Sequence, residues 1–182
     1  MLFFCIFSLT LGIFSHILVE NGTERDKMGS LLLGSYTARF DRSSRIKVPE
    51  KFRAAIEERY GKDLFITSLA DESVQVYPLS VWERLSGASM EGALQFNPAV
   101  RSFLVRVNRK GHHYRIDSKG RILINQSLRD KAELDEEVVV LGLTDHLEIW
   151  NKEKLDKILE EKPLTDEDFK SIAELLPQGK SK

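Results

Sequence analysis

Apolar and polar residues alternate along several short segments of this 182-residue chain, a pattern that predicts β-strands. Residues 34–40 show the alternation most clearly. Pro49 and Gly61 frame a helix over residues 50–60, because Pro is favoured in the first helical turn and Gly ends helices. Further strands are expected at residues 45–48, 64–68, 74–77, 110–116, 121–124, 138–143 and 146–150, and further helices after Pro78 and at residues 126–132 and 152–161.

Two more helices are predicted between and after these segments. Asn97 can cap a helix that has Pro98 at its first position. Its apolar residues form one stripe, made of Val100, Phe103, Leu104 and Val107. Near the end of the chain, Thr165 and Asp168 form the signature of a capping box for a helix over residues 165–176.

One part of the pattern occurs twice, first at residues 39–48 and again at residues 115–124. Both stretches contain Asp-x-x-x-Arg between alternating apolar residues, and both reach an apolar-Arg pair at the same offset, Phe52-Arg53 and Leu128-Arg129. Such self-similarity predicts a duplicated supersecondary unit. Each half offers four short strands and little apolar volume, so we expect the halves to interleave into one barrel-like core.

The repeated turn has a definite chemistry. Asp41 and Asp117 can accept hydrogen bonds from backbone amides two or three residues later, and the Arg of each turn, Arg45 or Arg121, can pair with that carboxylate. A guanidinium with free donors suits phosphate oxygens or a guanine edge. One such turn is more often a salt bridge worth under about 1 kcal/mol, but two copies in register favour a binding role.

The two turns differ at the residue before the Arg. Gly120 readily adopts the positive φ that such a turn requires. Ser44 stands at the matching place in the first turn, where the same conformation costs roughly 1 kcal/mol.

Charge is concentrated at these turns although the net charge is only −1. Residues 39–53 carry six bases against two acids, and residues 101–121 carry seven bases against one acid. This asymmetry predicts an anionic partner at the turns. The candidate binding residues are Arg39, Asp41, Arg42, Arg45, Arg115, Asp117, Lys119 and Arg121.

Other chemistry finds little support. Cys5 is the only cysteine, which excludes an intrachain disulfide and a cysteine-rich zinc site. His112 and His113 are adjacent on a predicted strand and would face opposite ways, so they are poorly placed to hold one metal ion. Since no phosphate-binding Gly loop or nucleophile elbow is present either, we expect no enzyme, metal or cofactor.

The apolar segment Leu2–Val19 has nearly the length of a membrane span. No Lys or Arg precedes it, and no cleavage site is clear. We interpret Met28 as the true first residue, and a membrane anchor or a signal peptide as the alternatives. The expected division of the chain is therefore an extension at 1–27, repeats at 33–80 and 109–153, linker helices at 81–108, and C-terminal helices and tail at 154–182.

An ordered set of motifs resembles the MraZ family over roughly residues 28–160. The motifs are Leu33-Gly34-Ser35-Tyr36, Asp41–Arg45, Val48-Pro49-Glu50-Lys51-Phe52-Arg53, Val76-Tyr77-Pro78 with Trp82, Asp117–Ile122, and Glu148-Ile149-Trp150. The resemblance implies an α+β, β-rich fold. In it, two tandem SpoVT-AbrB swapped-hairpin repeats form an interleaved, pseudo-twofold, double-psi-like β-barrel with flanking helices.

The resemblance also implies a function. It is that of a sequence-specific regulator of transcription, expected to be a repressor, which binds double-stranded DNA at repeated operator motifs. Its targets would be the division and cell-wall gene cluster, including its own promoter. The implied state is a ring-like homo-oligomer in the cytoplasm, associated with the nucleoid. The residues implied in DNA binding are Asp41, Arg45, Asp117 and Arg121, with neighbouring bases such as Arg39, Arg42 and Lys119.

Two departures from the family pattern bear on this expectation: Ser43-Ser44 occupies the usual Lys-Gly or Gln-Gly position, and no Pro follows the second return strand. Three alternatives stay open. The same fold could serve an AbrB-like antitoxin or global regulator, although such chains usually have one repeat. A membrane-tethered scaffold would use residues 2–19. A hydrolase acting on cell-wall precursors would need a convergent set of acids, bases or metal ligands, and we found none in the sequence.

Overall fold

The computed structural model describes residues 31–88 and 96–175, which form an α+β fold. The strands are β1 Leu32–Arg39, β2 Arg45–Lys47, β3 Asp63–Thr67, β4 Ser73–Pro78, β5 His112–Arg115, β6 Arg121–Leu123, β7 Glu137–Thr144 and β8 His146–Asn151. The helices are α3 Glu50–Tyr60, α4 Leu79–Ala88, α5 Pro98–Lys110, α6 Gln126–Lys131, α7 Lys152–Glu161 and α8 Asp166–Leu175. The predicted apolar segment at residues 2–19 lies outside the described residues.

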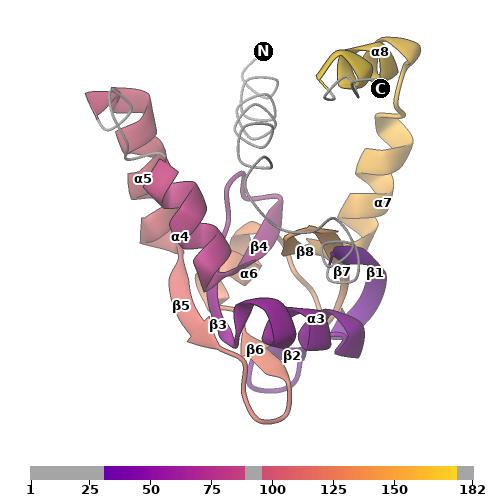
Figure 1. The fold of residues 1–182 in the computed structure, drawn as a ribbon. Coiled ribbons are helices and arrows are strands. Elements are labelled where there is room, and N and C mark those ends of the chain that lie inside the picture. The colour runs from indigo at the N-terminus through magenta and orange to yellow at the C-terminus, as the bar shows by residue number, and fades with distance from the viewer. Residues whose placement is uncertain (1–30, 89–95, 176–182) are drawn as a thin grey trace, which may run out of the picture.

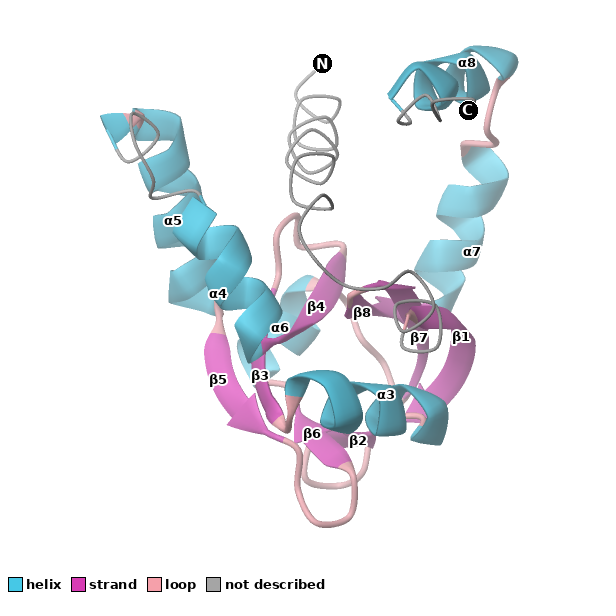
Figure 2. Ribbon diagram, viewed as in Figure 1, coloured by secondary structure: helices cyan, strands magenta, loops and turns pink. Residues whose placement is uncertain are grey.

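The strands of the two halves are interleaved (Figures 1 and 2). Six of them form an antiparallel sheet in the order β1-β7-β8-β4-β3-β5, and β2 and β6 form a second, two-stranded sheet. The first half therefore gives β1 to the second half, and the second half gives β5 to the first. Exchanging the halves reproduces the strand order, as the duplication predicts.

The expected closed barrel is not confirmed. In the described part of the chain, β1 and β5 end the six-stranded sheet. Beyond the end of β1, an isolated bridge between Phe40 and Ile46 and the hydrogen bond from the amide of Asp41 to the carbonyl of Arg45 at 2.8 Å connect the chain to β2. The pair β2–β6 is too short to extend the large sheet. The interleaving is nevertheless observed directly in the strand pairing, while the boundaries of the repeats at 33–80 and 109–153 stay a prediction.

The core lies between the two sheets and the short helices after the return strands. Each return strand and the helix that follows it supply the same pattern of apolar side chains, all at most 2% exposed. These residues are Ile46, Val48, Phe52 and Ile56 in the first half, and Ile122, Ile124 and Leu128 in the second. Burying each such side chain contributes about 1.5–3 kcal/mol, so the core holds the turns in place from beneath.

Local signals fix the ends of the helices as predicted. Gly61, at φ 83°, follows the last residue of α3. Asn97 Oδ1 accepts a hydrogen bond from the amide of Ala99 at 2.8 Å, and the capping box of Thr165 and Asp168 is formed at the start of α8. Helix α6 begins at Gln126 even though no Pro precedes it.

The long helices differ from the prediction in what they bury. In α5 only Val107 is buried, and Phe103 is 40% exposed although it belongs to the predicted apolar stripe. Leu159 of α7 is 62% exposed, and α8 buries no residue. Helices α5 and α8 project from the body at different sides of the molecule (Figure 1). Among the described helices, none has the length and apolar character needed to cross a bilayer.

One glycine position allows the halves to pack closely. A Cβ at Gly142 of β7 would lie 2.6 Å from the backbone carbonyl of Leu32 and 2.8 Å from the Phe52 ring. We expect Gly142→Ala to destabilise the fold by about 1–3 kcal/mol, because backbone must move to admit the methyl group. Urea unfolding followed by circular dichroism measures this.

Gly87→Ala provides the matched control. Gly87 lies in α4 with open space around it, so the substitution should be neutral or stabilise by no more than about 1 kcal/mol. Equal midpoints for the two variants would contradict the close approach of β1 and β7.

Candidate nucleic-acid interface

Turn 1, residues 41–44, joins β1 to β2, and turn 2, residues 117–120, joins β5 to β6. The pairing of β2 with β6, with Ile46 opposite Ile122, brings the two turns to the same end of the molecule. This end is remote from α5 and α8 (Figure 1). The structure therefore brings together two motifs that belong to different halves of the sequence.

Both turns have the hydrogen bonding expected from the Asp. Asp41 Oδ1 accepts from the amides of Ser43 at 2.8 Å and Arg45 at 3.0 Å. Asp117 Oδ1 accepts from the amides of Lys119 at 2.8 Å and Arg121 at 2.9 Å. The Asp thus fixes the backbone of each turn: the donor two residues later was predicted, whereas the second donor lies four residues later, beyond the predicted two or three.

The residue before each Arg adopts positive φ, as predicted. Gly120 has φ 73° and Ser44 has φ 58°. The carbonyl of each of these residues accepts from the return strand of the other half, Gly120 from the amide of Val48 at 2.9 Å and Ser44 from that of Ile124 at 3.2 Å. Each turn is therefore held by both halves.

Arg121 connects the two turns. Its Nε donates to Asp117 Oδ2 at 2.9 Å and its Nη1 donates to Asp41 Oδ2 at 3.0 Å. The predicted pairing of Arg with the Asp of its own turn is thus observed in turn 2. In turn 1 it is wrong, because Asp41 binds Arg121, and no hydrogen bond or ion pair joins the Arg45 side chain to another described residue.

These contacts shift the ionisation of the turn residues. The amide of Arg45, followed by that of Ser43 and the charge of Arg121, holds the pKa of Asp41 below the ordinary 3.8, against desolvation that raises it. The Arg121 amide, then its side chain, likewise lowers the pKa of Asp117. The hydrogen bond to Asp117 is the main cause that raises the pKa of Arg121.

Arg53 and Arg129 were not among the candidate residues predicted from the sequence, although both follow their turns at the same distance along the chain, which is a signal of a shared role. Each reaches the turn of the other half. Arg129 Nη1 donates to Ser44 Oγ at 2.5 Å, and its guanidinium lies 4.5 Å from the centre of the Phe40 ring. Arg53 lies against Gly120, where a Cβ would come within 2.8 Å of its Cδ.

The other candidate residues occupy different places. Arg39 and Arg115 lie at the strand ends that lead into the turns and form cross-strand ion pairs, with Glu137 at 2.8 Å and Asp63 at 2.9 Å. Arg42 and Lys119 are exposed in the turns themselves. The turn tips therefore present exposed cations, while the positive charges of Arg39 and Arg115 at the strand ends are partly neutralised by their acidic partners.

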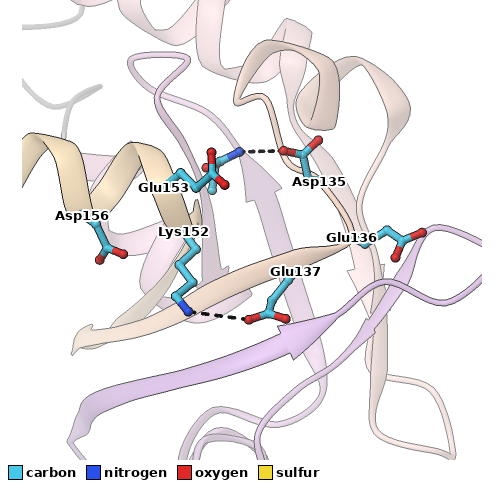
Figure 3. A pocket seen from close by; sticks show the side chains of 7 residues that line it. Asp135, Glu136, Glu137, Lys152, Glu153 and Asp156 are labelled. Carbon is cyan, nitrogen blue, oxygen red and sulfur yellow. Dashed lines mark hydrogen bonds and ion pairs between the residues drawn. The ribbon is translucent and has the colours of Figure 1, made fainter.

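An acidic hollow of about 490 Å³ borders the strand ends of β7 and β8 (Figure 3). Its lining is Asp135, Glu136, Glu137, Asn151, Lys152, Glu153 and Asp156. The amide of Asn151 donates to Asp135 at 3.1 Å, and Lys152 Nζ lies 3.8 Å from Glu137. This lining has five carboxylates and one lysine, so it repels a polyanion. The basic region around turn 1 therefore does not extend over this surface.

The adjacent histidines are separated as expected. His112 contacts Asn125 at 3.0 Å and the carbonyl of Leu123 at 3.3 Å, whereas His113 lies 3.3 Å from Asp63. Burial is the main cause that lowers the pKa of His112. Within the described ranges, no group of three or more His, Cys, Asp or Glu side chains is placed to hold a metal ion.

Fold and site together define a class: proteins made of a duplicated hairpin-and-helix unit, in which interleaved halves bring two basic Asp-x-x-x-Arg turns together. Comparison with known proteins then gives the family. The family model described as "MraZ protein, putative antitoxin-like" matches residues 109–174.

Several curated relatives named "Transcriptional regulator MraZ" are similar over most of their length. The protein of Acidobacterium capsulatum is 37% identical over 141 residues, which cover 78% of this chain and 96% of that protein. That of Koribacter versatilis is 33% identical over 143 residues, covering 78% and 97%. That of Mycobacterium tuberculosis is 35% identical over 121 residues, covering 66% and 81%. The chain belongs to the MraZ family.

The lowered pKa of Asp117 leads to a prediction about acid stability. Because its folded pKa lies below its unfolded value, the carboxylate stabilises the fold above about pH 4. That contribution is lost as the pH falls through the folded pKa. We therefore expect Asp117→Asn to be less stable than the parent at pH 7, and the gap to close below about pH 4.

Urea unfolding at pH 7, 5, 4 and 3 gives the comparison. Glu58→Gln, on an exposed face of α3, is the control and should follow the parent at each pH. A gap between Asp117→Asn and the parent that stayed constant down to pH 3 would exclude the carboxylate contacts as its cause.

Proposed function

We propose that this protein is a DNA-binding regulator of transcription that reads double-stranded DNA through turns 1 and 2. The observation that carries the proposal is that both Asp-x-x-x-Arg turns converge at one end of the molecule, joined by the contact of Arg121 with Asp41 and Asp117. The relatives compared above are named "Transcriptional regulator MraZ", which supports the same function.

The chemistry of the turns suits DNA. The exposed bases Arg42, Lys47 and Lys119 can contact phosphates and set the position of the protein on the duplex. The exposed guanidinium of Arg42 in turn 1 can alternatively donate two parallel hydrogen bonds to guanine O6 and N7 in the major groove. We propose repeated short operator motifs as the target, in the promoter of the division and cell-wall gene cluster that includes its own gene. This function places the protein at the nucleoid, with repression as the expected effect.

Self-association would multiply these contacts. Helix α5 carries four bases and no acid, while α8 carries four acids and one base. Both helices also expose apolar side chains, among them Phe103 and Val105 on α5 and Phe169 and Ile172 on α8. Because the helices project at different sides of the molecule (Figure 1), we propose that α5 of one copy binds α8 of the next. Such head-to-tail contacts close into a ring, and several turn pairs then bind a repeated operator with avidity.

The alternative with support is an AbrB-like antitoxin or global regulator, since the matching family model has an antitoxin-like description. It would keep the fold and the basic turns and change the target. Preference for one promoter sequence over others separates the two functions.

The decisive measurement is fluorescence anisotropy of the full chain with DNA from upstream of its own gene, against scrambled DNA of equal length. We expect the native sequence to bind about 10³-fold more tightly, with affinity for both falling steeply as salt rises because counterions are released. Equal affinities would reduce the turns to a general electrostatic surface and contradict the regulator.

For the assembly, we expect Arg101→Glu with Arg106→Glu on α5 to lower the oligomer mass measured by light scattering. Combining these changes with Glu167→Arg and Glu174→Arg on α8 should restore it, because the charges are exchanged rather than lost. Charge reversal at Glu58, on α3, is the control and should leave the mass unchanged. Loss without rescue would exclude the α5–α8 contact.

A further inference from the structure

Residues at equivalent positions of the two halves have different partners. Arg53 on α3 and Arg129 on α6 stand at the same offset from Asp41 and Asp117. Arg53 Nη2 pairs with the carboxylate of Glu50 at 2.6 Å. The residue equivalent to Glu50 is Gln126, a neutral amide whose oxygen lies 3.4 Å from Arg129 Nη1. The charge of Arg53 is thus compensated locally, and that of Arg129 is not.

The same difference separates the Arg residues of the turns. Arg121 forms ion pairs with both turn carboxylates, whereas Arg45 forms none and only its charge, at longer range, helps to lower the pKa of Asp41. The Nε atoms of Arg45 and Arg129 are both buried and have no acceptor among the described residues. A buried donor without a partner costs about 1–3 kcal/mol, and two at one place call for an explanation.

The two guanidinium groups that lack a carboxylate both flank turn 1. Arg45 directly follows Ser44, and Arg129 reaches the hydroxyl of the same Ser44 from the other half. The ring of Phe40 lies under the Arg129 guanidinium and limits its motion. Two planar guanidinium groups that are already positioned and have unused N–H donors are suited to bind the oxygens of a phosphodiester.

We propose that Arg45 and Arg129 form one phosphate-binding site at turn 1, built from both halves of the chain. Turn 2 has the complementary task of positioning: Arg121 bridges the two aspartates and holds turn 1 against it. The two halves therefore have similar backbones but different roles, phosphate binding at turn 1 and positioning at turn 2. The inference deepens the proposed function and rests on it, since the phosphate is that of the DNA bound by the turns.

Gln126→Glu is the sharpest test, because it gives Arg129 the carboxylate that Arg53 already has and keeps the size of the side chain, although it removes the hydrogen bond that Gln126 Nε2 donates to Asp130. We expect it to weaken DNA binding about tenfold and to lower the slope of log affinity against log salt by about 0.9, one phosphate contact. Arg129→Ala and Arg45→Ala should lower the slope equally, while Arg53→Ala, at the equivalent position, should leave it unchanged.

Fluorescence anisotropy across a salt series measures the slopes, and thermal unfolding shows whether each variant is folded. Equal losses of slope in Arg53→Ala and Arg129→Ala would overturn the division of roles. So would an unchanged slope in Gln126→Glu, which would assign Arg129 to stability alone.

Retention on phosphocellulose, a polyanion without base sequence, separates this inference from the proposed function. Earlier elution of Gln126→Glu and Arg129→Ala than of Arg53→Ala is expected, and it would support the phosphate site even if the protein failed to discriminate between DNA sequences. Identical elution of the three variants would overturn the site whatever the DNA result.

Discussion

In the described part of the chain, β1 obtains its ladder partner from the second half and β5 obtains its partner from the first, while β2 pairs with β6. This mutual completion is the constraint on which the rest of the structure depends. Unpaired backbone groups are costly when buried, so neither half can bury its return strand without the other. The turns consequently lie together because the backbone requires it, and their side chains then make the contacts that the polar pattern allows.

The two turns have nearly the same backbone and differ in a few side chains. The second half has Gln126 where the first half has Glu50, and the first half has Ser44 where the second has Gly120. These differences change the electrostatics around the turns. Ser44 accepts a strained conformation worth roughly 1 kcal/mol and in return offers a hydroxyl to Arg129. Local strain of this kind is often found at functional sites, where surrounding contacts maintain it.

The sequence predicted the features that depend on neighbouring residues. The Asp-to-amide bonds, the positive φ of Ser44 and Gly120, and the caps of α5 and α8 all follow from local chemistry. It could not show that Asp41 binds Arg121 rather than Arg45, because that choice is made between distant parts of the chain. The same holds for Phe103, because its spacing predicts an apolar face on the helix but does not show what covers that face.

Interleaving also has a consequence for synthesis on the ribosome. Leu32 of β1 is paired with Thr144 of β7, which the ribosome adds much later. At about 5–20 residues per second, the nascent first half waits roughly 6–22 s for its partner strand. During that interval β1 is an open sheet edge, able to pair with another nascent chain. Arg39, the charged residue at the end of β1, disfavours such pairing, because charged side chains on an edge strand discourage the addition of another strand.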